Sequence, residues 1–202
     1  FCGLDVGTSK TCIVAARKYK DGKFEITGCG FSVSSGLKKS NIVNSGEATG
    51  SIRKAAKELE TGSGIYADWV FAGISGQHVK STLLRGAVPI EGKHHRVTEQ
   101  NVAEVIHAAK TVPLPSQPEI LHVTPREFFL DDRGDIQDPV GMTGCKLEAD
   151  ISAITADGAM VQTLINAING AQIRVRKVAF TPVASGEAML TSDEQEGGAA
   201  VI

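Results

Sequence analysis

A short stretch near the start of the chain combines residue types that together bind phosphate groups. Asp5 ends an apolar run, and Gly7, Thr8, Ser9 and Lys10 follow it. A glycine lets the backbone turn tightly and approach a ligand, and the N–H groups of the next three residues, with two hydroxyls, form an anion cradle. Lys10 adds a positive charge, whereas Asp5 would hold Mg²⁺ through water, because this ion keeps much of its hydration shell. By spacing alone, the motif also fits an ordinary hairpin turn beside an acidic residue.

The elements predicted around this turn define the fold that would position it. Three strands come first, and Asp21-Gly22, a dipeptide typical of hairpins, joins the second to the third. A helix and a buried strand follow, and after residue 156 the order helix, strand, helix resumes. This order predicts an α/β fold, the ribonuclease-H-like half of an actin-type ATPase. The predicted strands span residues 1–6, 11–16, 24–31, 69–74 and 173–180, and two of the helices end at Gly62 and Gly170.

The middle of the chain breaks this order and predicts a separate module. Residues 80–156 contain the elements strand, helix, strand and strand, which make a small α+β subdomain inserted into the first. Pro125 lies inside one of these strands, and proline within sheets is confined to edges and bulges. We therefore expect residues 1–79 and 157–198 to form one discontinuous domain and residues 199–202 to begin the second half of the ATPase.

Motifs along nearly the whole chain resemble one family of the actin superfamily. Residues 3–10 (GLDVGTSK) resemble the first phosphate motif that actin, heat-shock-70 proteins and sugar kinases share. Other stretches, in loops as well as in the predicted core, resemble FtsA, the actin homologue of bacterial cell division. The most specific of them is DPVGMTG at residues 138–144, followed by LEA at 147–149. The others lie at residues 36–39, 42–44, 51–55, 72–78, 97–99 and 190–194.

The resemblance implies a cell-division scaffold that binds ATP and Mg²⁺. FtsA proteins link the ring of the tubulin-like protein FtsZ to the membrane, recruit later division proteins and associate into filaments. The implied location is therefore cytoplasmic, at the inner face of the cell membrane at the division site. The resemblance assigns the insertion to contacts with neighbouring subunits and division proteins, and not to catalysis. We expect its proline-interrupted strand to offer an edge for pairing, and loss of self-association after changing Arg126 or Phe128 would support this hypothesis.

The resemblance also places half of the nucleotide site outside these 202 residues. A second phosphate loop is expected to begin directly after Ile202, with the adenine pocket, the FtsZ-binding surface and a C-terminal membrane helix further on. The chain opens and closes inside apolar runs, as expected of a piece of a longer protein. We therefore expect little or no ATP affinity from this chain alone.

One position departs from the pattern of related ATPases. These proteins often place Glu or Gln after the strand that here ends at Phe180, where the side chain orients the attacking water. This chain has Thr181-Pro182 there, and a threonine hydroxyl is a poor base with a short reach. The departure predicts at most weak hydrolysis, with ATP acting as a structural and polymerisation switch.

Composition and charge narrow the classes of function that this chain can have. With 21 basic and 23 acidic residues and a net charge of −2, the chain lacks the electrostatic footprint of a nucleic-acid-binding protein. Its four cysteines show no metal-binding spacing and fit a cytoplasmic setting.

Three other protein classes share parts of this pattern. A sugar or small-acid kinase would need a catalytic aspartate and a sugar pocket, and a ribonuclease-H-like nuclease would need further carboxylates near Asp5. A type IV pilus assembly adaptor, which also binds ATP, is the other relative, although residues 139–149 favour division.

Overall fold

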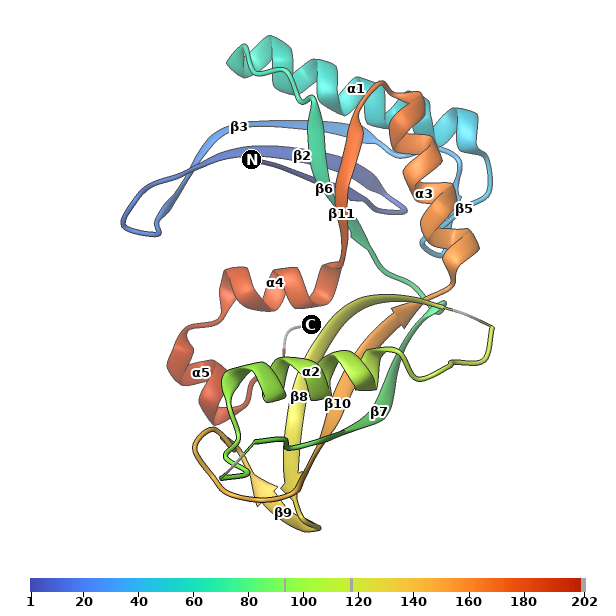
Figure 1. The fold of residues 1–202 in the computed structure, drawn as a ribbon. Coiled ribbons are helices and arrows are strands. Elements are labelled where there is room, and N and C mark those ends of the chain that lie inside the picture. Colours follow the sequence, from blue (N-terminus) through green and yellow to red (C-terminus); the bar gives the residue numbers. More distant parts are fainter. Residues whose placement is uncertain (93, 117, 201–202) are drawn as a thin grey trace. The chain divides into compact units, whose positions relative to one another are not determined.

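The computed structural model describes residues 1–92, 94–116 and 118–200 of the chain (Figure 1). Residues 201–202, which the sequence assigns to a further strand, lie outside the described residues, and Ala199–Ala200 directly before them are not part of a strand. None of the described helices is long and apolar enough to cross a lipid bilayer.

The chain forms two compact units, each with its own core (Figure 1). The first unit comprises Phe1–His78 and Gly158–Ile202, and the second is the continuous segment Val79–Asp157. The sequence places the insertion at residues 80–156, one residue inside the second unit at each end. The first unit is therefore discontinuous in sequence, and the second unit is inserted between two of its elements.

A five-stranded mixed sheet forms the centre of the first unit. β1, β2 and β3 make the predicted antiparallel meander, and β6 and β11 add parallel to β1, which gives the order β11-β6-β1-β2-β3. Because β1, β6 and β11 are parallel, their carboxyl ends lie at the same edge of the sheet. The strands are β1 (Cys2–Val6), β2 (Lys10–Lys18), β3 (Phe24–Val33), β6 (Trp69–Ile74) and β11 (Arg174–Phe180).

Two helices cover one face of this sheet. α1 (Ser45–Ser63) packs on β2 and β3, and α3 (Gly158–Gly170) packs on α1 and β11 (Figure 1). Asn44 caps α1 by accepting a hydrogen bond from the backbone N–H of Glu47, which satisfies one of the free donors at the helix start. Apolar residues at helical spacing on α1 meet alternate residues of the strands in the core. The fully buried core residues include Ile13, Ile52, Leu59, Val70 and Ile168.

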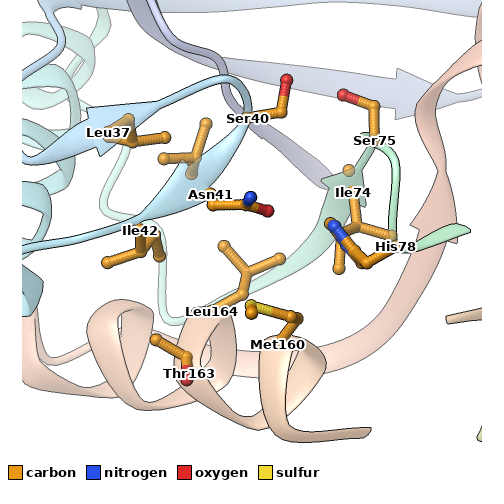
Figure 2. Close-up of a pocket in the computed structure, with 12 residues that line it drawn as sticks. Leu37, Ser40, Asn41, Ile42, Ile74, Ser75, His78, Met160, Thr163 and Leu164 are labelled. Atoms are coloured by element: carbon orange, nitrogen blue, oxygen red, sulfur yellow. The ribbon is translucent and has the colours of Figure 1, made fainter. Parts of the chain in front are cut away.

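A small hairpin follows β3. β4 (Leu37–Lys38) pairs with β5 (Asn41–Ile42). Residues of the hairpin, of the end of β6 and of α3 line a cavity of about 20 Å³ (Figure 2). This volume is room for about one water molecule.

The second unit is a four-stranded sheet with one helix on a face. The strand order is β7-β10-β8-β9, and α2 contacts β7 and β10. Val105 and Ala109 of α2 are fully buried in the core of this unit, which also contains Ile151 of β10. The elements are β7 (Val79–Pro89), α2 (Glu99–Lys110), β8 (Glu119–Leu130), β9 (Arg133–Ile136) and β10 (Lys146–Ala156).

Pro125 lies in β8 beside a bulge and where none of the described strands pairs with its outer side, and a bulge or an edge is what the sequence predicts for it. Pro125 pairs with Ile151 of β10 next to a bulge. On its other side, β8 pairs with β9 only near its end, through Phe128 and Leu130. The short strand β9 is an addition to the predicted order of strand, helix, strand and strand, and it forms only because β8 provides its partner.

Two short helices follow β11 in the first unit. α4 (Thr181–Met189) begins directly after the strand, with Pro182 in its first turn, and α5 (Ser192–Gly197) comes next. α5 forms a helical turn because Thr191 caps it and the Glu194 side chain accepts a hydrogen bond from the Thr191 N–H.

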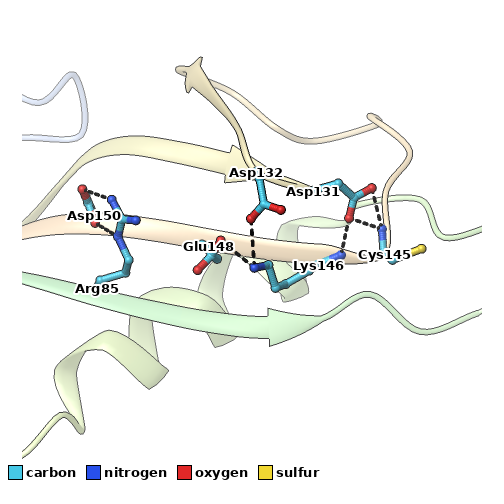
Figure 3. A network of polar contacts seen from close by, with 7 residues as sticks. All are labelled: Arg85, Asp131, Asp132, Cys145, Lys146, Glu148 and Asp150. Carbon is cyan, nitrogen blue, oxygen red and sulfur yellow. Dashed lines mark hydrogen bonds and ion pairs between the residues drawn. The ribbon is translucent and has the colours of Figure 1, made fainter.

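An ion pair crosses the strands on the face of the second unit's sheet that is turned away from its core (Figure 3). Arg85 of β7 donates two hydrogen bonds to the carboxylate of Asp150, its register partner in β10, at 2.5 and 2.7 Å. The guanidinium also lies 4.4 Å from the ring centroid of Phe129. The hydrogen bonds from Arg85 hold the pKa of Asp150 below its usual range.

We expect this ion pair to make stability depend on pH at the acidic end. A carboxyl group whose pKa is lowered by folding stabilises the fold above its unfolded pKa of about 3.9, and the contribution disappears as the pH falls through the folded pKa. Asp150→Asn should therefore lower the free energy of unfolding at neutral pH by up to about 1 kcal/mol, because Arg85 is half exposed.

Urea unfolding of the wild-type and Asp150→Asn chains at neutral pH and at about pH 3 measures this effect. The difference between the two chains should shrink at the lower pH. Arg85→Lys, which keeps the charge but loses the paired donors, should give a smaller loss than Asp150→Asn. An equal loss from Asp150→Asn at both pH values would contradict the assignment.

Candidate functional site

The turn between β1 and β2 presents two unpaired backbone donors at its tip. Gly7 closes the turn by donating its N–H to the Lys10 carbonyl at 3.0 Å. The N–H groups of Thr8 and Ser9 make no hydrogen bond within the described parts of the chain, and both residues are exposed. Lys10 begins β2, in register with Val33 of β3. Two of the three donors expected from the sequence therefore stand at the tip, where they suit an anion.

The Lys10 side chain supplies a positive charge beside this turn. Its Nζ atom lies 6.0 Å from the ring centroid of Phe31. A cation at this distance from an aromatic ring is held only weakly at an exposed site. The flexible stem of the lysine therefore leaves the ammonium group able to reach an anion at the turn.

Asp5 and Thr181 meet at the carboxyl ends of parallel strands. Asp5 of β1 lies in register with Gly73 of β6, which lies in register with Ala179 of β11. The hydroxyl of Thr181, the first residue of α4, donates a hydrogen bond to Asp5 Oδ1 at 3.3 Å. The position that departs from the ATPase pattern therefore contacts the residue predicted to hold Mg²⁺, although 176 positions separate them in sequence.

Gly73 makes room for this contact. A Cβ atom at Gly73 would lie 2.6 Å from Thr181 Oγ1 and 3.0 Å from Asp5 Oδ1. Gly7 is also crowded, because a Cβ atom there would lie 3.1 Å from the Lys10 carbonyl oxygen. Both glycines thus occupy places where the backbone comes close to its neighbours.

A hollow of about 440 Å³ lies beside Asp5, between α4 and the face of the sheet that α1 and α3 leave uncovered. Its lining is mostly small and apolar, with Asp5, Thr181, Ser185 and Cys12 as the residues that bring polar groups. Burial raises the pKa of the Cys12 thiol, so this thiol stays protonated at neutral pH. The hollow therefore presents a carboxylate and hydroxyl groups on an otherwise apolar surface.

The remaining predicted site residues lie in the second unit. Arg126 is exposed on β8. Phe128 is only 6% exposed and packs in the core of this unit. A change at Phe128 would therefore disturb the core, whereas a change at Arg126 can test self-association without disturbing the core.

Neither the role of Gly73 nor the contact between Thr181 and Asp5 was predicted from the sequence. A signal for both was present, since each lies at or just after the end of a strand in a pattern of alternating strands and helices. Ligands bind at the carboxyl ends of strands in such sheets. What the sequence could not provide was the strand order, which makes β6 the neighbour of both β1 and β11.

We expect Thr181→Val to remove the hydrogen bond to Asp5 without changing the shape of the side chain. Losing it should lower the free energy of unfolding by about 1 kcal/mol. Gly73→Ala should cost about 1–3 kcal/mol, because the added Cβ must displace Thr181 or Asp5. Gly50→Ala is the matched control, since a Cβ atom there meets nothing within 4 Å and alanine favours the helix. Urea unfolding measures the free energy of unfolding of all three variants. Equal changes in Gly73→Ala and Gly50→Ala would contradict the close approach at Gly73.

Comparison with known proteins shows what this chain is similar to. Residues 76–155 match the model of the SHS2 domain inserted in FtsA. The cell division protein FtsA of Borreliella burgdorferi is 37% identical over 196 residues, and that of Bacillus subtilis is 31% identical over 202 residues. These matches cover 97% and 100% of this chain but 48% and 46% of the relatives. The chain therefore spans about half the length of the curated relatives it matches.

A solved structure supports the fold. The PilM-PilN type IV pilus biogenesis complex contains a chain that matches with a TM-score of 0.58 at 14% identity, over 92% of this chain and 48% of that one. At this identity the likeness concerns the fold alone, and it confirms the actin-type half-domain predicted from the sequence. Along nearly its whole length the chain is thus similar to the cell division protein FtsA of bacteria, and its inserted unit matches the SHS2 domain that is inserted in FtsA.

Proposed function

We propose that this chain is the ATP-binding first half, with the SHS2 insertion, of an actin-like cell-division scaffold. The observation that carries the proposal is the edge of the first sheet. There the unpaired N–H groups of Thr8 and Ser9 directly follow Gly7, where a Cβ atom would lie 3.6 Å from Asp5 Oδ2. Donors of this kind bind phosphate oxygens. A nearby carboxylate is the ligand type that Mg²⁺ takes together with substrate phosphates.

The donor set fits a nucleotide phosphate chain with its metal. Thr8 and Ser9 would bind phosphate oxygens through their backbone N–H groups, and Lys10 would add its charge. Asp5 would hold Mg²⁺ through water, and Mg²⁺ neutralises charge on the phosphates. Thr181 holds the Asp5 carboxylate in place and is a poor general base. ATP therefore acts in this proposal as a switch for assembly, with at most weak hydrolysis.

The cellular role that we propose is a link between the FtsZ ring and the inner face of the cell membrane. The relatives at 37% and 31% identity carry the name cell division protein FtsA. In this proposal the SHS2 unit contacts neighbouring subunits in filaments and later division proteins. The exposed Arg126 on β8 is its candidate contact residue. The pilus alternative has weaker support, because the likeness to PilM concerns the fold alone.

Titration of the ¹⁵N-labelled chain with Mg·ATP tests the nucleotide site. The amide signals of Thr8 and Ser9 should shift, with saturation only at high ATP concentration because this chain supplies half of the expected site. Asp5→Asn should abolish the Mg²⁺-dependent part of the shifts. Asp21→Asn removes the same charge from an exposed turn and should behave as wild type. Tight binding would contradict the half-site, and shifts confined to other residues would contradict the turn as the phosphate site.

Imaging in the source organism tests the cellular role. The protein encoded by the whole gene, fused to a fluorescent protein, should form a band at the division site together with FtsZ. Depletion should give long undivided cells, because the ring would lose its attachment. Diffuse fluorescence with normal division after depletion would overturn the division role.

A further inference from the structure

The hairpin of β4 and β5 holds two successive residues in an unfavourable backbone conformation. Lys39 and Ser40 have φ angles of 49° and 63°. Two-residue hairpins of this kind normally place Asn-Gly or another glycine pair at these positions, because other side chains are strained there. Strained backbone of this kind persists only where the surrounding structure determines it, and it gathers at functional sites.

The strained turn contacts the phosphate turn. The backbone N–H of Ser40 donates a hydrogen bond to Thr8 Oγ1 at 3.0 Å. A hydroxyl group has one proton to donate and two lone pairs that accept. Because Ser40 occupies a lone pair, the hydroxyl proton of Thr8 is free to point away from the hairpin. Thr8 can therefore donate through its hydroxyl as well as through its backbone N–H.

Contacts on the other sides of the hairpin hold it in this place. At its base, the carbonyl of Gly36 accepts hydrogen bonds from Val43 at 2.8 Å and from Asn44, the cap of α1, at 3.1 Å. On its inner side, the amide of Asn41 points into the small cavity between the hairpin, β6 and α3 (Figure 2). The Asn41 Oδ1 atom is buried and has no hydrogen-bond partner in the described parts of the chain. The base of the hairpin is thus closed directly before α1, and β5 packs against α3.

We propose that Ser40 is a positioning residue for the phosphate site, and that residues 37–42 form the element that orients the Thr8 hydroxyl toward a bound phosphate. The inference rests on the proposed function, because it assigns to that site a third donor beyond the two backbone N–H groups. The ligand class is a nucleoside triphosphate with Mg²⁺, and the hydroxyl donates to one of its phosphate oxygens. The strain at Lys39 and Ser40 is then the consequence of aiming the Ser40 N–H at Thr8.

Hydrogen exchange without ligand tests the contact. The amide of Ser40 should exchange more slowly in wild type and in Thr8→Ser, which keeps the hydroxyl. It should exchange about tenfold faster in Thr8→Val, which removes the acceptor. Equal exchange in all three proteins would overturn the inference whether or not the chain binds ATP.

Titration with Mg·ATP, followed by the amide signals of Ser9 and Lys10, tests the positioning role. Thr8→Val should weaken apparent affinity several-fold and Thr8→Ser should restore it. The combined variant Lys38→Gly, Lys39→Gly, Ser40→Gly and Asn41→Gly should weaken affinity similarly, with only a small fall in the midpoint of urea unfolding, because glycine adds freedom to the unfolded chain. Ser40→Gly keeps the N–H and relieves the strain, so it should bind as wild type.

The outcomes separate this inference from the proposed function. Wild-type binding together with unchanged affinity in Thr8→Val, or in the glycine variant, would overturn the positioning role and leave the phosphate site in place. A large loss of stability that accompanies the fall in affinity in the glycine variant would assign the hairpin a purely structural role and also overturn the positioning role. If wild type shows no shifts at the turn while the Ser40 amide is protected, the proposed function fails, and the hairpin has no phosphate site to position.

Discussion

The parallel pairing of β1 with β6 and of β6 with β11 is the constraint on which the first unit depends. Parallel neighbours require a crossover connection, and α1 and α3 lie in those connections and cover the same face of the sheet. The pairing brings three carboxyl ends to one edge. There Asp5 of β1, Gly73 of β6 and Thr181 after β11 meet beside the turn into β2. The core and the candidate site therefore follow from the same strand order.

The SHS2 unit fits into this framework because it brings a sheet and a core of its own. It is inserted between β6 and α3, in one of the crossover connections of the first unit. Its buried residues, among them Val105 and Ile151, pack with each other. Its charged residues, such as Arg85 and Asp150, pair on the opposite face of its sheet. A module built in this way can acquire contacts with partners without changing the residues that form the phosphate site.

Local signals in the sequence were sufficient for much of the fold. The turn at Asp21-Gly22 and the helix end at Gly170 each depend on a few neighbouring residues, and each is found where the pattern predicts it. Elements that depend on distant partners were missed. The strand β9 needs β8 beside it, and the hairpin of β4 and β5 turns at Lys39-Ser40, which lack the glycine or asparagine that usually marks such a turn.

The sequence by itself determined the composition of the phosphate turn, because Asp5, Gly7, Thr8 and Ser9 are neighbours in the chain and a strand followed by a glycine turn is a local structure. It also indicated the resemblance to FtsA, since the motifs that carry it lie along nearly the whole chain. Only the tertiary structure decided that Thr181 donates to Asp5 across 176 positions, that Gly73 makes room for both, and that Ser40 donates to Thr8. These contacts depend on strand order and on the placement of a strained hairpin, and neither leaves a local pattern in the sequence.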